Sequence, residues 1–145
     1  MSKIKLLFNF LQMPETLTTL NILAVDDNKL NLLLLSQLLK LLGLSSDLAY
    51  GGAEAIEKAN NKKYDLIFMD VHMPDIDGFM ATAEIRKNNK DTIIFALSAD
   101  STQPAIKRGL LAGMNDYLTK PIGRNHLHTI LVDYFGERIP SIKKN

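Results

Sequence analysis

Short apolar runs alternate with helix-like segments along most of the chain. The apolar runs predict five strands: Asn21–Val25, Ser46–Tyr50, Asp65–Met69, Thr92–Leu97 and Asp116–Leu118. The segments between and after them have helical spacing and predict five helices: Lys29–Leu42, Ala53–Asn60, Phe79–Asn88, Thr102–Ala112 and Asn125–Phe135. Gly43 and Gly113 stand directly behind two of these helices, where a glycine commonly ends a helix.

A strand followed by a helix, five times over, predicts an α/β fold with a doubly wound, five-stranded parallel sheet. The strands are short and continuously apolar, as expected when helices cover both faces of the sheet. The pattern sets a domain at residues 21–136. Residues 1–20 form an N-terminal extension or linker with some helical spacing, and residues 137–145 form a polar tail.

Composition narrows the class of protein. The chain has 145 residues, of which 46% are hydrophobic, with a net charge of +1 and no cysteine. This length and apolar content suit one domain with a real core. A chain without cysteine has no disulfides and no thiolate metal site, and its small net charge gives no general attraction to nucleic acid. The most apolar stretch, Leu30–Leu44, is interrupted by polar residues, so we expect no membrane insertion and a cytoplasmic location.

Polar side chains that can carry chemistry follow four of the five strands. Asp26 and Asp27 follow the first strand, Asp70 the third, Ser98 the fourth and Lys120 the fifth. In an open parallel sheet, ligands bind at the carboxyl ends of the strands, so these side chains should meet at one edge. Three carboxylates at one edge need a cation, and an all-oxygen donor set suits Mg²⁺. Together with a lysine and a hydroxyl, they predict a site for phosphoryl chemistry.

Each of these residues also has an ordinary structural explanation. An aspartate pair after a strand is most often a turn or a helix cap, a serine is usually a cap, and a lysine is usually a solvated surface charge. These explanations account for each residue alone but not for their joint placement at the strand ends.

At this point the sequence resembles the receiver (response-regulator, CheY-like) domains of two-component signalling, most of all those of hybrid histidine kinases and phosphorelays. The matching segments cover about residues 21–135: ILAVDDN (Ile22–Asn28), LLKLLG (Leu38–Gly43), GGAEAI (Gly51–Ile56), YDLIFMDVHMPDIDG (Tyr64–Gly78), ALSAD (Ala96–Asp100) and GMNDYLTKPI (Gly113–Ile122). The resemblance implies a flavodoxin-like sheet with strand order 2-1-3-4-5.

The resemblance also implies roles at the acidic edge. Asp70 would be the phosphoacceptor, and Mg²⁺ would be held by Asp27, Asp70 and the main-chain carbonyl of His72. Asp26 would act on the metal mainly through water. Lys120 would pair with the phosphoryl group, and a cis peptide would precede Pro121.

The same resemblance assigns a switch. Ser98 would be the switch hydroxyl and Tyr117 the switch aromatic, which respond to the phosphoryl group and repack the surface formed by helix 102–112, strand 116–118 and helix 125–135.

The implied partners are a histidine kinase or a histidine phosphotransfer protein, which would dock on helix 29–42 and the rim of the site. We expect a stand-alone response regulator that catalyses only its own phosphotransfer and dephosphorylation. The alternative is the C-terminal receiver of a hybrid histidine kinase. The chain shows no recognition helix for nucleic acid. A turnover phosphatase with an aspartyl nucleophile is disfavoured, because such enzymes typically place a second acid where this chain has His72. The downstream target and the signal stay open.

Two features depart from the general pattern. His72 and Asp100 each lie two residues after a site residue, and we expect this pair to set the dephosphorylation rate. Helix 29–42 carries more leucine than one core face requires. That surplus fits a docking surface, a homodimer contact, or a face covered by the chain's own N-terminus, where Ile4, Leu7, Phe8 and Leu11 have helical spacing; a loose linker is the ordinary alternative.

Overall fold

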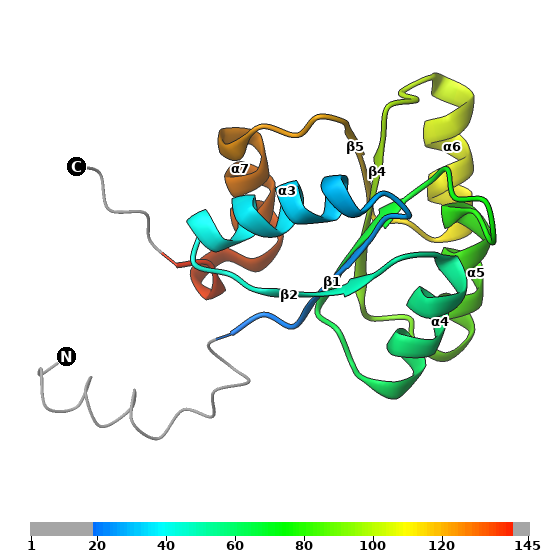
Figure 1. The fold of residues 1–145 in the computed structure, drawn as a ribbon, viewed down its shortest axis with the longest axis horizontal. Helices are drawn as coiled ribbons and strands as arrows, with labels where there is room; N and C mark the ends of the chain where they lie inside the picture. The colour runs from blue at the N-terminus through cyan, green and yellow to red at the C-terminus, as the bar shows by residue number, and fades with distance from the viewer. Residues whose placement is uncertain (1–18, 141–145) are drawn as a thin grey trace, which may run out of the picture.

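A five-stranded parallel sheet organises the structure, a computed structural model that describes residues 19–140 (Figure 1). Its strands are β1 (Ile22–Val25), β2 (Ser46–Ala49), β3 (Leu66–Asp70), β4 (Ile93–Ser98) and β5 (Asp116–Thr119). They pair in the order β2-β1-β3-β4-β5, and every pair is parallel. The predicted fold class and strand order are therefore confirmed. The predictions for residues 1–18 and 141–145 lie outside the described residues.

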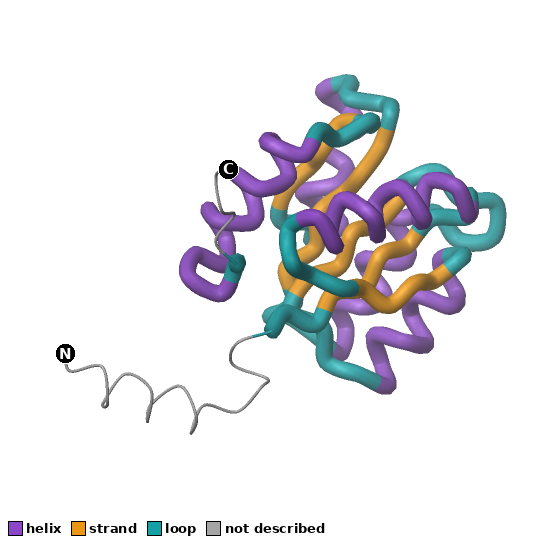
Figure 2. Tube along the Cα trace, turned by 60° about the vertical axis from the view of Figure 1, so that its left-hand side comes forward, coloured by secondary structure: helices purple, strands orange, loops and turns teal. Residues whose placement is uncertain are grey.

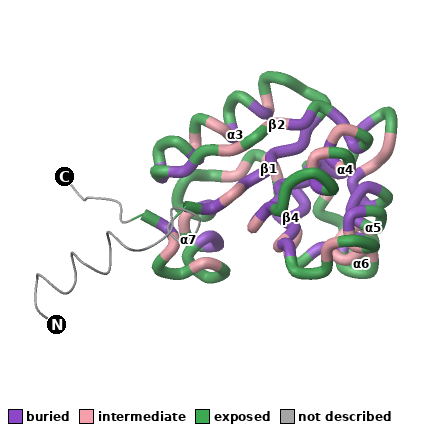
Figure 3. The backbone as a smooth tube through the Cα atoms, turned by 90° about the horizontal axis from the view of Figure 1, so that it is seen from below, coloured by how far each residue is buried: buried purple, intermediate pink, exposed green. Residues whose placement is uncertain are grey.

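The helices form a layer on each face of the sheet (Figure 2). They are α3 (Lys29–Leu41), α4 (Gly52–Asn61), α5 (Gly78–Asn88), α6 (Gln103–Ala112) and α7 (Arg124–Phe135), followed by the short 3₁₀ helix η1 (Gly136–Arg138). Leucines of α3 and α7 pack on one face of the sheet, around Phe68 and Phe95. The other face carries a second core, to which α4 and α5 contribute Ala55, Phe79 and Ile85. The central strands β1 and β3 are buried along their whole length and β4 is buried from its second residue on (Figure 3), whereas the edge strands β2 and β5 are partly exposed.

Local sequence signals explain where the helices begin and end. Asn28, Asp77 and Thr102 cap α3, α5 and α6, because each side-chain oxygen accepts a hydrogen bond from a backbone N–H in the first turn. Gly113 ends α6 with φ of 109°, in the left-handed region that favours glycine, as the sequence predicted.

Strand ends differ slightly from the sequence prediction, and the difference bears on the site. Asp70 and Ser98 are the last residues of β3 and β4 rather than the first residues after them. Asp70 pairs with Leu97, and Ser98 pairs with Thr119, in the parallel ladders. The backbones of both residues are therefore fixed by the sheet.

The packed structure continues a few residues past position 136, the boundary set from the sequence. Arg138 forms a salt bridge with Asp65 at 3.2 Å, and its guanidinium also donates a hydrogen bond to the Thr19 carbonyl at 3.1 Å. Ile139 is buried in the core between the sheet and α3. The segment after α7 thus ties the two ends of the described chain together.

Within the described residues, no helix is long and apolar enough to cross a membrane.

Candidate functional site

Three aspartates meet at the carboxyl ends of β1 and β3. Asp26 and Asp27 directly follow β1, and Asp70 ends β3. One carboxylate oxygen from each lies within 4.8 Å of the others, which is close enough for a shared cation. Asp26 and Asp70 are buried, whereas Asp27 is exposed. The structure therefore brings together the three acids that the sequence singled out.

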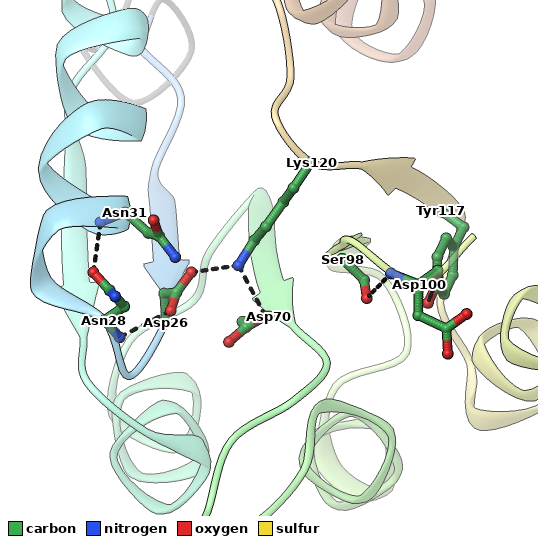
Figure 4. Close-up of polar contacts among 8 residues, drawn as sticks. All are labelled: Asp26, Asn28, Asn31, Asp70, Ser98, Asp100, Tyr117 and Lys120. Carbon is green, nitrogen blue, oxygen red and sulfur yellow. Dashed lines mark hydrogen bonds and ion pairs between the residues drawn. The ribbon is translucent and has the colours of Figure 1, made fainter. Parts of the chain in front are cut away.

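Lys120 reaches across from the end of β5 and joins two of these acids (Figure 4). Its Nζ lies 2.7 Å from Oδ2 of Asp26 and 3.1 Å from Oδ1 of Asp70. The peptide bond between Lys120 and Pro121 is cis, as the resemblance implied. The other oxygen of Asp26 accepts a hydrogen bond from the backbone N–H of Asn28 at 2.9 Å. Asp26 therefore has protein donors on both oxygens.

The electrostatics of this cluster are unbalanced. The pKa of Asp70 is raised to about 6: burial is the largest cause, the nearby Asp26 adds to it, and the hydrogen bond and charge of Lys120 offset only part of the rise. Burial alone would lower the pKa of Lys120, but its hydrogen bonds to Asp26 and Asp70 outweigh burial and raise it. A single ammonium thus serves two buried carboxylates, and the cluster lacks positive charge.

The donor set fits Mg²⁺. The candidate ligands are carboxylates, the oxygen donors that this hard cation prefers, and no cysteine is present in the chain. A dication at the cluster would supply the missing positive charge and favour the ionised form of Asp70. Asp27 and Asp70 are the better direct ligands, because both oxygens of Asp26 already accept hydrogen bonds.

Ser98 and Tyr117 lie on the β4–β5 side of the same edge, and both contact Asp100. Ser98 is buried, and its Oγ accepts a hydrogen bond from the Asp100 backbone N–H at 3.0 Å. The Tyr117 hydroxyl donates to the Asp100 carbonyl at 2.6 Å (Figure 4). The short segment 98–100 therefore links the hydroxyl and the aromatic side chain that the resemblance assigned to a switch.

His72 and Asp100 are near enough to interact electrostatically, but the Asp100 carboxylate is engaged elsewhere. Asp100 accepts a hydrogen bond from the Thr102 backbone N–H at 3.1 Å. This contact is the main reason why the pKa of Asp100 is lowered, and the charge of His72 adds a smaller effect. These contacts do not test whether His72 and Asp100 set the dephosphorylation rate, which stays a prediction.

Two further residues hold the loop after Asp70: Gly78, which the sequence places where this loop turns into a helix, and Asp75, to which the sequence gave no role. A Cβ at Gly78 would lie 2.2 Å from the Asp70 carbonyl oxygen, so only glycine allows α5 to start against the end of β3. Asp75 accepts hydrogen bonds from the backbone N–H groups of Gly52 and Ala53 at 3.2 and 3.0 Å. It caps α4 from a distant loop, so no local pattern in the sequence could have revealed it.

An apolar groove opens beside the cluster, between α3 and the segment after β5. Asp26 and Lys120 stand at its edge, and its volume is about 130 Å³. Its walls include Leu34 and Leu38 of α3, together with Pro121 and Ile122. The acidic cluster therefore borders an apolar surface on α3.

A comparison with protein families identifies the family to which the chain belongs. The family model of the response regulator receiver domain matches residues 22–132, which include every element from β1 to most of α7. The chain is a receiver domain.

Curated relatives of this receiver come from bacteria and eukaryotes. It is 40% identical over 124 residues to the osmosensing histidine protein kinase SLN1 of Saccharomyces cerevisiae, covering 81% of this chain and 10% of that protein. It is 37% identical over 122 residues to the signal transduction histidine-protein kinase BarA of Escherichia coli, covering 83% of this chain and 13% of that protein. The receiver thus spans a small part of the relatives it matches. It belongs to a family of phosphoacceptor switches in phosphorelay signalling.

Solved structures agree with this assignment. The receiver domain of a sensor histidine kinase from Pseudomonas aeruginosa PAO1 is 39% identical, with a TM-score of 0.75 over 81% of this chain and 98% of that one, and it has a magnesium ion in its active-site cleft. The receiver domain of Ssk1 from Saccharomyces cerevisiae, solved with the histidine phosphotransfer protein Ypd1, is 32% identical with a TM-score of 0.75 over 81% of this chain and 89% of that one.

Proposed function

We propose that this receiver accepts a phosphoryl group on Asp70 from a phosphohistidine of a histidine kinase or a histidine phosphotransfer protein. The observation that supports this most is the convergence of Asp26, Asp27, Asp70 and Lys120 at one edge of the sheet. A carboxylate held there by the ladder beside a fixed ammonium is a suitable nucleophile for phosphoryl transfer.

In the proposed step, an oxygen of Asp70 attacks phosphorus in line with the bond to the donor histidine nitrogen. The new bond is an acyl phosphate, and the phosphorus–nitrogen bond breaks with its electron pair going to the imidazole. Lys120 lies 3.1 Å from Asp70 and would donate hydrogen bonds to the phosphoryl oxygens. Mg²⁺, held by Asp27, Asp70 and the His72 carbonyl, would neutralise charge at the site when bound.

The switch follows from the contacts of segment 98–100. A phosphoryl group on Asp70 offers acceptor oxygens to Ser98, whose Oγ now accepts from the Asp100 N–H. If Ser98 turns toward the phosphoryl group, that hydrogen bond breaks, and the Asp100 carbonyl that Tyr117 contacts moves with the segment. Phosphorylation would thereby repack the surface formed by α6, β5 and α7.

The proposed partner surface is α3 together with the rim of the site, where the apolar groove borders Asp26 and Lys120. The complex of the Ssk1 receiver with Ypd1 supports a histidine phosphotransfer protein as a partner of such a domain. The parent protein is either a stand-alone response regulator, the reading favoured from the sequence, or a hybrid histidine kinase like several of the relatives. In both cases we expect the receiver to act as a switch in the cytoplasm rather than as a turnover enzyme.

The test is incubation with Mg²⁺ and a small phosphodonor, followed by intact mass measurement. We expect one acid-stable, base-labile phosphoryl group on the wild type and none on Asp70→Asn. Asp91→Asn, which changes an exposed carboxylate just before β4, at the opposite end of that strand from Ser98, is the control and should be labelled like the wild type. Equal labelling of wild type and Asp70→Asn would show that Asp70 is not the acceptor.

A further inference from the structure

The outward face of α3 carries leucines that the core does not use. Leu32, Leu35 and Leu39 are buried against the sheet. Leu30, Leu33, Leu34 and Leu41 are instead between 52% and 62% exposed. Positions 30, 34 and 41 fall on one side of a helix, since 3.6 residues make a turn. Figure 3 shows exposed stretches on successive turns of α3. Single exposed leucines are ordinary, but a stripe of them on one short helix indicates a surface that another segment or molecule contacts.

This leucine face (Leu30, Leu33, Leu34 and Leu41) continues into the site. Leu34 also lines the groove that has Asp26 and Lys120 at its edge. Any segment that covers the leucine face along its length therefore reaches the acidic cluster, where Asp27 is exposed.

The described chain begins beside the far end of the same helix. Leu20 is buried in one cluster with Leu39 and Leu42, at the C-terminal end of α3. Pro140 lies directly against Gly43, and two residues earlier Arg138 hydrogen-bonds the Thr19 carbonyl. The first 18 residues thus join the domain on the sheet face that α3 covers, close to where α3 ends.

The sequence of those 18 residues is complementary to the leucine face. Ile4, Leu7, Phe8 and Leu11 recur at helical spacing, i, i+3, i+4 and i+7. Lys3 and Lys5 stand at the far end of this apolar stripe. The α3 helix has 13 residues and is about 20 Å long, whereas 18 residues span about 27 Å even when helical. A segment that runs back along α3 from Thr19 would bring its lysines to the exposed Asp27.

We propose that residues 1–18 cover the leucine face of α3 within the same molecule. Their apolar stripe would bury Leu30, Leu34 and Leu41, and Lys3 and Lys5 would lie toward Asp27. A tethered segment has an effective concentration of about a millimolar, which favours it over a second copy of the chain in dilute solution. A partner that docks on α3 would compete with this segment for the same leucines; this consequence rests on the proposed function, but the covering does not.

Disulfide trapping tests the covering directly, because the chain contains no cysteine of its own. Leu7→Cys is combined with Leu34→Cys, oxidised at low protein concentration, and read by non-reducing electrophoresis and intact mass. Leu7→Cys with Leu111→Cys is the matched control, because Leu111 is an even more exposed leucine but lies on α6, which packs on the opposite face of the sheet. All substituted side chains on the domain are exposed, so the variants should fold.

We expect an intramolecular disulfide in the Leu7/Leu34 variant at a yield at least fivefold above the control. Adding Ile4→Glu and Leu11→Glu, which place charges in the apolar stripe, should reduce that yield to the control level. A covalent dimer, equal yields in both pairs, or no effect of the added charges would each overturn the proposal. The experiment uses no phosphodonor, so a failure of Asp70 to be phosphorylated would leave its result unchanged.

Discussion

The two ends of the sheet treat their charged groups in opposite ways. At the amino end, Asp47 and Asp65 have donors of their own: Asp47 accepts from Tyr64 at 2.7 Å and from Lys62 at 3.0 Å, and Asp65 is paired with Arg138. At the carboxyl end, Lys120 is shared between two buried acids. The hydrogen bond from Tyr64, with that from Lys62, lowers the pKa of Asp47, whereas burial raises that of Asp70 to about 6.

The contrast shows that the acids at the amino end of the sheet contribute to stability, whereas the buried acid at the carboxyl end costs stability and is placed for chemistry. Asp47 at the amino end stabilises the fold when it is ionised, because its pKa is lowered in the folded state. Ionised Asp70 at the carboxyl end opposes folding until a cation arrives, since burial and the neighbouring Asp26 both disfavour its charge. A site of this kind favours binding of a dication, because its carboxylates lack compensating positive charge without one, and the bound dication can then neutralise an incoming phosphoryl group.

The largest effect is expected at Gly78. In Gly78→Ala the added Cβ would lie 2.2 Å from the Asp70 carbonyl oxygen, so α5 must move away from β3. We expect a loss of about 3 kcal/mol or more in the free energy of unfolding, measured by urea denaturation. Gly123→Ala is the control, because an added Cβ there meets no atom within 4 Å. Similar losses in both variants would show that close approach at Gly78 is not the cause.

Removal of the Asp70 charge should stabilise the metal-free protein. Since the pKa of folded Asp70, about 6, exceeds the unfolded value of about 3.9, the folded state binds more protons between these values and stability falls as pH rises through them. We expect Asp70→Asn to be about 1–2 kcal/mol more stable than the wild type at pH 7 in EDTA.

The same pair of proteins gives a second readout. Thermal unfolding should show that Mg²⁺ stabilises the wild type and has little effect on Asp70→Asn. A wild type that is as stable as the variant in EDTA at pH 7 would contradict the view that the ionised Asp70 carboxylate destabilises the folded protein.

At the amino end, loss of a charged partner should have the opposite sign. Arg138→Ala removes the salt bridge to Asp65 and the hydrogen bond to the Thr19 carbonyl. We expect a loss of about 1 kcal/mol in unfolding free energy, because the ion pair is partly exposed. Arg108→Ala is the matched control, since its guanidinium is well exposed and lies 3.7 Å from Asp77. A stabilising effect of Arg138→Ala would reverse the contrast between the two ends.

The smallest effect concerns acid at Asp47. Its pKa is lowered in the folded state, so its contribution is present at neutral pH and is lost as pH falls below the unfolded value of about 3.9. Because the side chain is well exposed, we expect no more than a few tenths of a kcal/mol. Asp47→Asn should reduce the loss of unfolding free energy between pH 4 and pH 2 in urea titrations. An unchanged loss over this range would show that Asp47 does not contribute to the pH dependence of stability.

The sheet and the acidic cluster could both be predicted from the sequence, but for different physical reasons. Strands such as Leu66–Asp70 are buried on both faces, so their apolar runs are unambiguous. Because parallel strands end at one edge, the positions of Asp26, Asp70 and Lys120 along the chain implied their meeting in space. Strand bounds shifted by at most one residue, since the ladder extends as far as its partner allows.

Long-range contacts escaped prediction. Asp75 caps α4 from 22 residues away, and Arg138 reaches Asp65 over a separation of 73. Neither pairing follows a local pattern, because it depends on how loops pass one another in the folded chain. The Arg138 contact also explains why packing continues beyond the boundary set at residue 136.

The central claim is that Asp70 is the residue that carries the phosphoryl group. The most direct measurement is borohydride reduction of the chain after treatment with Mg²⁺ and a small phosphodonor, followed by peptide mass spectrometry, because hydride converts an acyl phosphate to an alcohol at the labelled carboxylate. We expect reduction at Asp70 alone, dependent on Mg²⁺ and abolished by EDTA. Reduction at Asp26, Asp27 or another carboxylate while Asp70 stays intact would contradict it.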